Sequence, residues 1–332
     1  MKHIVVMSDM KAADIRPAAL LSRFKEVSIA ESELYFSDRS ALVEIPCPAC
    51  QSGNTAEAFK KNEFEYRQCL VCESVFLSPR PSEEALAAYY QNSRANEFRQ
   101  DLSHETADAR RFHVLRSRFS WVGRVFDEAG NLSTPSYADI GTTHPLIFEE
   151  VKRLHLFDEL YSVDPTFDLG EEAPAMGVTA EQASLQGLGV VTAFEQLERQ
   201  FSPLAFLKNI YDMLVDGGIL FLTARTISGF DLQVLWGQAP YIFVPEHLNL
   251  LSINGMTQML ESAGFRILEL STPGQLDVEL VMRATAEDPT IKLPRFVQYV
   301  LDQRGMETQA DFQSFLQKNR LSSHVRIAAK KG

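Results

Sequence analysis

The sequence predicts an α/β protein: a mainly parallel sheet covered by helices on both faces, with a small cysteine ribbon near its N-terminus. From residue 136 onward, strand-like apolar runs alternate with helix-like runs, a period typical of parallel sheets. Four cysteines fall in two pairs ahead of that region. The length of 332 residues suggests two domains, or one large domain with a small appendage.

Composition and charge exclude several function classes. Hydrophobic residues make up 45% and charged residues 23%, as in an ordinary soluble protein. The formal net charge of −12 opposes a nucleic-acid-binding surface. Met1–Met7 does not read as a signal peptide, and no run approaches the ~18 apolar residues of a membrane span. We therefore expect a cytoplasmic protein with no nucleic-acid or membrane partner.

Residues 1–45 form an N-terminal extension whose role the sequence leaves open. Their pattern predicts a strand at Ile4–Met7, a helix at about Pro17–Phe24 and an extended stretch at Leu42–Ile45.

The cysteine pairs predict a metal site within a ribbon at residues 46–81. Cys47 and Cys50 form one Cys-x-x-Cys turn, Cys69 and Cys72 form the other, and 18 residues separate the two. Each turn can aim two sulfurs at one ion, and a hairpin between them brings the turns together. Four thiolates leave no open position around zinc, so we expect a structural ion. Unrelated buried thiols or disulfides are the alternative.

Residues 82–130 predict a helical connector. Ser82 is suited to cap a short helix, and apolar residues at three- and four-residue steps predict a longer helix over about Glu105–Ala129. Arginines populate much of its other surface. They either grip phosphates of a nucleotide-linked substrate or form a solvated, ion-paired face. These arginines are Arg110, Arg111, Arg116, Arg118 and Arg124.

Residues 131–285 carry the alternating pattern. Helices are expected to begin near Pro145, Ser202 and Ser252, with proline or serine suited to a helix start, and the last should end at Gly264. Residues 286–332 predict a helical extension ending in a strand at Val325–Ala328. The strands predicted before it are Tyr137–Ile140, Leu160–Val163, Met176–Thr179, Leu188–Phe194, Ile219–Leu222, Phe265–Leu270 and Val278–Met282.

Four segments carry a family resemblance. They are the cysteine ribbon with the following Ser78–Pro81, the run Leu214–Phe221, the string Pro245–Ser252 and the string Ser271–Val278. Residues 46–330 resemble a class I S-adenosylmethionine-dependent methyltransferase of a subgroup with an N-terminal zinc ribbon, many members of which act on sugars or other small metabolites. The resemblance implies a Rossmann-like seven-stranded sheet with one antiparallel strand. It places the cofactor at the carboxyl ends of the first strands, in agreement with the switch-point rule.

The resemblance also assigns cofactor-binding residues. Asp139 and Gly141 begin the cofactor loop, and Asp164 ends the second strand, where a carboxylate can accept both ribose hydroxyls. The family pattern D-x-G-x-G-x-G is altered, because Thr143 and Pro145 stand at the second and third glycine positions. A β-branched residue forced into positive φ costs about 1–2 kcal/mol or more. Asp139, Gly141, Thr143 and Asp164 are therefore predicted cofactor contacts around an altered loop.

Catalytic candidates come from the substrate side of the family pattern. His247 is the first candidate for a base, with a hydrogen-bonded structural histidine as the alternative. Glu198 is the second catalytic candidate; it and Glu195 can orient substrate or simply begin a surface helix. The family's Glu-x-x-Glu-His string ends in Arg199 here. Weaker candidates are Tyr241, Glu246 and His324, and Trp236 and Phe243 are aromatic residues that either wall the pocket or belong to the core.

Two functions follow. The first is an S-adenosylmethionine-dependent methyltransferase acting on a small molecule, such as a nucleotide-linked sugar or a polysaccharide precursor. The alternative is a catalytically inactive methyltransferase-like protein that binds or regulates a protein partner, because the altered loop and Gly189, where the family typically has an acidic residue, weaken the cofactor site.

Overall fold

The computed structural model describes residues 10–15, 17–130, 136–142, 144–163, 177–181 and 185–332. The predicted strand at Ile4–Met7 and the predicted cofactor contacts Thr143 and Asp164 lie outside the described residues.

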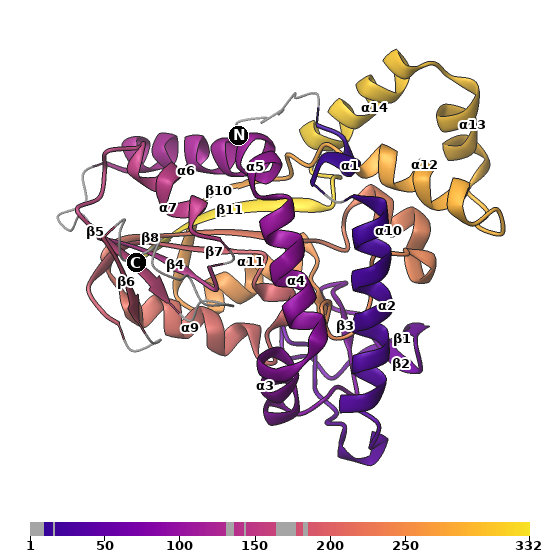
Figure 1. Ribbon diagram of the computed structural model, residues 1–332, viewed down its shortest axis with the longest axis horizontal. Coiled ribbons are helices and arrows are strands. Elements are labelled where there is room, and N and C mark those ends of the chain that lie inside the picture. Colours follow the sequence, from indigo (N-terminus) through magenta and orange to yellow (C-terminus); the bar gives the residue numbers. More distant parts are fainter. Residues whose placement is uncertain (1–9, 16, 131–135, 143, 164–176, 182–184) are drawn as a thin grey trace.

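A seven-stranded sheet forms the centre of the molecule (Figure 1). Its strands lie in the order β10-β11-β8-β7-β4-β5-β6. β11 pairs antiparallel with both of its neighbours, whereas the pairs from β8 to β6 are parallel. The strands are β4 Ser136–Ile140, β5 Glu159–Val163, β6 Val178–Glu181, β7 Leu188–Phe194, β8 Leu214–Arg225, β10 Phe265–Ser271 and β11 His324–Lys331.

Helices cover both faces of this sheet (Figure 1). Alternate strand residues point to opposite faces, so Val190 packs toward α6 and α7 while Val191 packs toward α9 and α11. The expected architecture, with seven strands, one of them antiparallel, and helices on both faces, is confirmed. The helices are α6 Arg116–Ala129, α7 Leu146–Lys152, α9 Pro203–Met213 and α11 Ile253–Ser262.

The ribbon forms a second sheet, and one of its strands comes from a distant part of the chain. Its three antiparallel strands are completed by β9 (Asn249–Leu250), which pairs with β3. Arg80 is fully buried at this junction, where its guanidinium donates to four acceptors. The ribbon is therefore built into the larger domain. Its own strands are β1 Thr55–Lys61, β2 Phe64–Cys69 and β3 Val75–Leu77. The four acceptors are the carbonyl oxygens of Leu77, Phe201 and Leu248 and the Oδ1 of Asn249.

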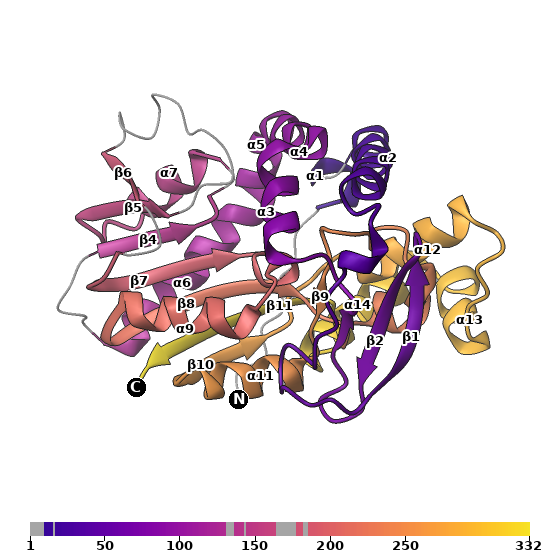
Figure 2. The same cartoon turned by 90° about the horizontal axis from the view of Figure 1, so that it is seen from below.

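The N-terminal helices form a cover beside the carboxyl edge of the sheet (Figures 1 and 2). α2 lies along α4, where Phe24 stacks on Phe98 and meets Phe243 edge to face. Ser82 caps α3 through a 3.2 Å bond from the Ala85 N–H, as predicted. The bounds are α1 Ala12–Ile15, α2 Ala18–Tyr35, η1 Arg39–Ala41, α3 Glu83–Asn92, α4 Arg94–Glu105, α5 Ala107–Arg110 and the π-helical turn η2 Arg111–Leu115.

The C-terminal part differs from the sequence prediction at one element. The strand predicted at Val278–Met282 is wrong, because those residues lie in α12 (Asp277–Glu287). A short apolar run fits a strand or a buried helix equally well, and here Asp277 accepts bonds from Ser322 Oγ at 2.6 Å and Ser323 N at 2.7 Å at the start of the helix. The predicted strand Val325–Ala328 lies within β11. The remaining helices are η3 Leu197–Arg199, α10 Phe230–Leu235, η4 Trp236–Gln238, α13 Arg295–Gln303 and α14 Met306–Lys318.

In the described part of the chain, no helix has both the length and the apolar composition that crossing a membrane requires.

Candidate functional site

The four cysteines meet at one point through two copies of the same turn. The Cys47 N–H donates to the Ser52 carbonyl at 2.9 Å, and the Cys69 N–H donates to the Ser74 carbonyl at 2.8 Å. The residue after each second cysteine takes a left-handed conformation, with φ 60 at Gln51 and 63 at Glu73. These repeated turns aim the sulfurs inward.

The donor set fits a tetrahedral metal ion. All four Sγ atoms lie within 4.8 Å of one another, and the Cys47–Cys72 and Cys50–Cys69 sulfurs are 3.5 Å apart. Zinc bound by four sulfurs at about 2.3 Å requires sulfurs roughly 3.8 Å apart. The thiols are unbridged, which removes the disulfide alternative.

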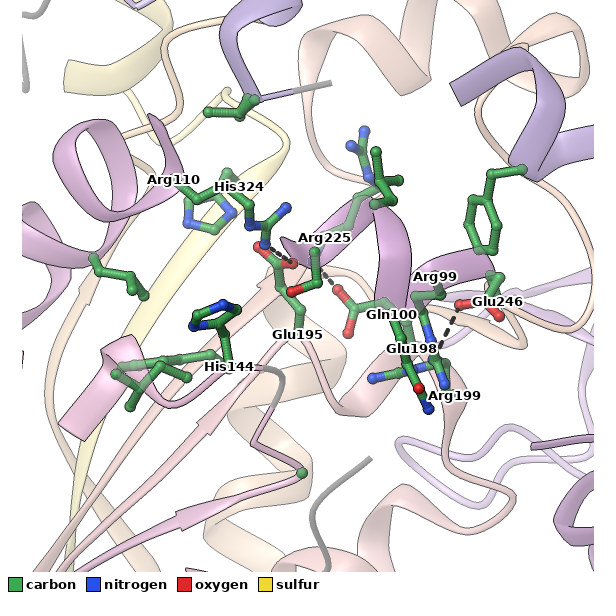
Figure 3. A pocket seen from close by; sticks show the side chains of 18 of the residues that line it. Arg99, Gln100, Arg110, His144, Glu195, Glu198, Arg199, Arg225, Glu246 and His324 are labelled. Atoms are coloured by element: carbon green, nitrogen blue, oxygen red, sulfur yellow. Dashed lines mark hydrogen bonds and ion pairs between the residues drawn. The ribbon is translucent and has the colours of Figure 1, made fainter. Parts of the chain in front are cut away.

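A cavity of about 250 Å³ opens at the carboxyl ends of β4, β7 and β8. Helices α2, α4 and α5 wall one side of it, and the segment 241–247 walls another. Figure 3 shows the charged side chains that surround it. Of the predicted site residues, those that line the cavity are Asp139, Gly141, Glu198 and His247, together with the weaker candidates Glu195, Tyr241, Phe243, Glu246 and His324. Trp236 packs instead on the ribbon, with its Nε1 donating to the Ala58 carbonyl.

The loop after β4 is held by hydroxyl groups. Asp139 is buried, and its two carboxylate oxygens accept from Thr142 Oγ1 at 2.8 Å and Thr192 Oγ1 at 2.6 Å. Ser162 Oγ donates to Thr142 Oγ1 at 2.9 Å. Burial raises the pKa of Asp139 to about 6, although both threonines act to lower it. Asp139 therefore stabilises the loop through hydrogen bonds with Thr142 of the loop and Thr192 of β7.

Gly141 is required by both its conformation and its surroundings. Its φ is 69, and a methyl group on its Cα would lie 2.6 Å from Gln196 Oε1. Gln196 also donates to the carbonyls of Phe194 at 3.1 Å and Gly141 at 3.4 Å. Pro145, at the third glycine position of the family pattern, has φ −57 and caps α7 without any need for positive φ. Gly141 is therefore required by its positive φ and by the close packing of Gln196 against it.

Glu198 is a buried carboxylate at the cavity wall. Its Oε1 accepts the Arg225 backbone N–H at 2.5 Å, and its Oε2 is buried without a hydrogen-bond partner among the described residues. Burial raises its pKa to about 7, and the neighbouring charge of Glu195 acts in the same direction. A carboxylate with this pKa can take or give a proton at neutral pH.

His247 and Glu246 approach the cavity from the segment after β8. Val244–Pro245 is a cis peptide bond, and the backbone there places Glu246 3.6 Å from Arg99 of α4. Burial raises the pKa of Glu246. His247 Nδ1 lies 3.4 Å from the Phe243 carbonyl oxygen. Both predicted residues therefore face the cavity at the point where α4 closes over it.

Sequence reasoning missed the basic side of the cavity. Arg118 is buried and pairs with Glu195, whose other oxygen lies 4.0 Å from Arg110. Arg225 pairs with Asp231 at 3.4 Å. Arg110 and Arg118 belong to the arginine-rich segment that the sequence analysis singled out, and they line the cavity. Arg111 and Arg124 of the same segment are ion-paired away from the cavity, as the second alternative predicted.

A sequence model of a family described as "Methyltransferase domain" matches residues 49–270, which is more than half of the chain. No curated protein shows a significant match.

Solved structures with a similar fold include an S-adenosylmethionine-dependent methyltransferase from Thermotoga maritima, with 14% identity over 70% of this chain and 98% of that one and a TM-score of 0.43. One from Mesorhizobium loti has 10% identity over 63% and 96% and a TM-score of 0.38. A plantazolicin methyltransferase in complex with S-adenosylhomocysteine has 12% identity over 74% and 94% and a TM-score of 0.44.

Proposed function

The chain belongs to the methyltransferase domain family, and we propose that it transfers a methyl group from S-adenosylmethionine to a small molecule held in the cavity. The observation that carries this proposal is Glu198: a buried carboxylate with one anchored oxygen and one unpartnered oxygen at the cavity wall. A nucleotide-linked sugar or a polysaccharide precursor is the acceptor class we favour.

The cofactor would rest over the loop after β4. Gly141 supplies the positive-φ turn at the start of this loop, and Asp139 keeps the loop in place through Thr142 and Thr192. Thr143 and Asp164 remain proposed contacts from the sequence pattern. S-adenosylmethionine supplies an electrophilic methyl group when bound. The protein's own part is to align the acceptor with that methyl group and to exclude water, which the cover formed by α2 and α4 favours.

Glu198 then accepts a proton from the attacking atom of the acceptor. Its pKa of about 7 keeps a large fraction deprotonated at neutral pH while retaining basicity. His247 and Glu246 lie on the cavity wall supplied by the segment 241–247, where we propose that His247 assists by orienting the acceptor or by sharing the proton.

A zinc ion held by Cys47, Cys50, Cys69 and Cys72 would stabilise the ribbon without taking part in transfer, because four thiolates complete its coordination. The unbridged thiols fit a reducing compartment, and we propose the cytoplasm.

The test is calorimetric titration with S-adenosylmethionine and S-adenosylhomocysteine. We expect micromolar binding to the wild type and stabilisation that grows with ligand concentration. Absence of binding at millimolar concentration would overturn the enzymatic proposal and favour the inactive, protein-binding alternative. Methyl transfer from labelled cofactor to a panel of nucleotide-linked sugars then tests the acceptor class.

A further inference from the structure

Arg326 of β11 is a buried cation with an incomplete set of partners. Its side chain is 7% exposed. Its two terminal nitrogens reach only the Ser117 carbonyl at 3.4 Å and Ser117 Oγ at 3.1 Å, and the guanidinium lies over Trp121. Among the described residues, no carboxylate lies within ion-pair distance of it, and its Nε has no hydrogen-bond partner. Such a charge is costly to bury unless an anion meets it.

The sheet register explains why no protein carboxylate meets this charge. Arg326 pairs with Thr223 on β8 and with Ser271 on β10, and directly paired residues share a face of the sheet. Both neighbours bring hydroxyls, and both hydroxyls are buried without a partner among the described residues. Glu269 is the carboxylate whose charge acts on Arg326, but its oxygens already accept hydrogen bonds from Arg124 and Trp121.

Arg326 lines a second cavity of about 100 Å³. This rear cavity shares Arg118, Glu195, Arg225 and His324 with the main cavity, so the two cavities are adjacent. Its volume exceeds the roughly 10–15 Å³ that a single water needs several times over. That is enough space for a compact anionic group.

Two further unpartnered nitrogen atoms belong to residues that line the rear cavity. Arg118 gives its terminal nitrogen to Glu195, but its Nε is buried without a partner, as is Nδ1 of His113 from the π-helical turn. Two acidic residues line the rear cavity. Glu195 is paired with Arg118, and Asp277 is bonded on both oxygens by Gln313, Ser322 and Ser323. Burial and the neighbouring Arg118 lower the pKa of Arg326 to about 9, so it stays charged at neutral pH.

We propose that the acceptor carries an anionic oxygen group, a phosphate or a carboxylate, which binds in the rear cavity between Arg326 and Arg118. Guanidinium groups bind both kinds of oxyanion through paired N–H donors. This inference rests on the proposed function for the identity of the ligand as an acceptor, but the anion site itself stands on the geometry of these two arginines.

The test uses inorganic phosphate and acetate as probes. Thermal unfolding of the wild-type protein is followed with increasing phosphate or acetate, with chloride added to hold the ionic strength constant. We expect a saturable rise in Tm with at least one probe, and the more effective probe identifies the anion class. In Arg326→Met and Arg118→Met we expect the apparent affinity for that probe to fall at least tenfold. Arg116→Met is the matched control, since Arg116 is on the same helix, half-exposed, and outside both cavities.

Absence of any saturable rise in the wild type would overturn the proposal, as would a wild-type response in Arg326→Met. A purely structural Arg326 predicts a lower Tm in that variant with an unchanged probe response, whereas our proposal predicts an equal or higher Tm without probe, because an unpaired buried charge has been removed. If Arg326→Met does not fold, Arg326→Lys must show weakened probe binding. S-adenosylhomocysteine binding is measured in parallel, so its loss would count against the proposed function and not against the anion site.

Discussion

The cysteine ribbon and the loop after β4 position their ligand-facing groups by different means. In the ribbon, two copies of one six-residue turn place four sulfurs, and each turn is closed by its own backbone hydrogen bonds. In the loop, positions come from residues elsewhere in the chain. Thr192 and Ser162 of neighbouring strands hold Asp139 and Thr142, and Gln196, just after β7, fills the space beside Gly141. A sequence motif therefore describes the ribbon well and the loop poorly.

The altered loop illustrates this difference. By the family pattern, Pro145 replaces a glycine, yet its backbone is helical and needs no glycine. The departure from the motif at that position therefore introduces no backbone strain in the described structure. What the loop does need, a glycine at 141, it retains.

The largest effect is expected from Cys69→Ser, which removes one of four thiolates. Metal-binding free energies in comparable four-ligand sites reach about 10–16 kcal/mol, so loss of the ion should unfold the ribbon and lower Tm strongly. Metal analysis and thermal unfolding measure this. Val71→Ser changes an exposed residue of the same turn and should retain both metal and Tm. A Cys69→Ser protein with full zinc content would show that Cys69 is not needed to hold the ion, contrary to the role given to the ribbon.

Glu198→Gln should have the next largest effect, on the transfer rate. Loss of a general base lowers rates about 10²–10⁴-fold, while binding of S-adenosylhomocysteine should be unchanged. The wild-type rate should rise with pH through about 7, since the base acts when deprotonated. A rate profile without this rise, or an unchanged rate in the variant, would contradict the assignment.

Stability should show the opposite pH trend. The pKa of Glu198 is raised from 4.5 to about 7, so between those pH values the folded state binds more protons than the unfolded state. The free energy of unfolding therefore falls as pH rises over this window. Urea unfolding from pH 4.5 to 8 should show a smaller fall in Glu198→Gln than in the wild type; an equal fall would argue against a buried, protonatable Glu198.

Gly141→Ala sharpens the comparison on the loop side. Positive φ costs a non-glycine residue about 1–2 kcal/mol, and the added methyl group collides with Gln196. Cofactor affinity should fall about tenfold or more, as 1.4 kcal/mol corresponds to tenfold. Gly130→Ala is the control, because Gly130 has φ 85 but no atom near the added methyl group. Gln196→Ala should partly rescue Gly141→Ala. If Gly141→Ala bound cofactor as well as Gly130→Ala does, the role given to Gly141 would be wrong; if Gln196→Ala gave no rescue, the role given to Gln196 would be wrong.

The smallest effect is expected from Thr142→Val. It leaves one oxygen of Asp139 without its donor and should cost about 1 kcal/mol of unfolding free energy. The cost should grow as pH rises through about 6, where Asp139 ionises and needs the donor more. Thr257→Val, whose hydroxyl bonds only within helix α11, is the comparison in urea unfolding. A pH-independent cost would indicate that Asp139 is not the reason.

The sequence predicted what is encoded locally. The cysteine spacing, the Ser82 cap and the strand Leu188–Phe194 depend on neighbours in the chain, and each appears in the structure. Val278–Met282 was misassigned because its helix is fixed by Ser322 and Ser323, far along the chain. Nothing in the sequence around Arg326 predicts that it lacks an acidic partner, because this depends on Thr223 and Ser271, which lie beside it only in the folded sheet.

The short strand β9 has a practical consequence. Because it completes the ribbon sheet directly after the segment that brings His247 to the main cavity, the cysteine ribbon and the wall of that cavity are connected through the same stretch of chain. Deleting residues up to Pro81 would remove β3, the strand that pairs with β9. It would also leave the carbonyl groups of Phe201 and Leu248 without the hydrogen bonds that Arg80 donates. We therefore expect a chelator that removes the proposed metal ion to make the wall of the main cavity more mobile under conditions in which the central sheet is still folded.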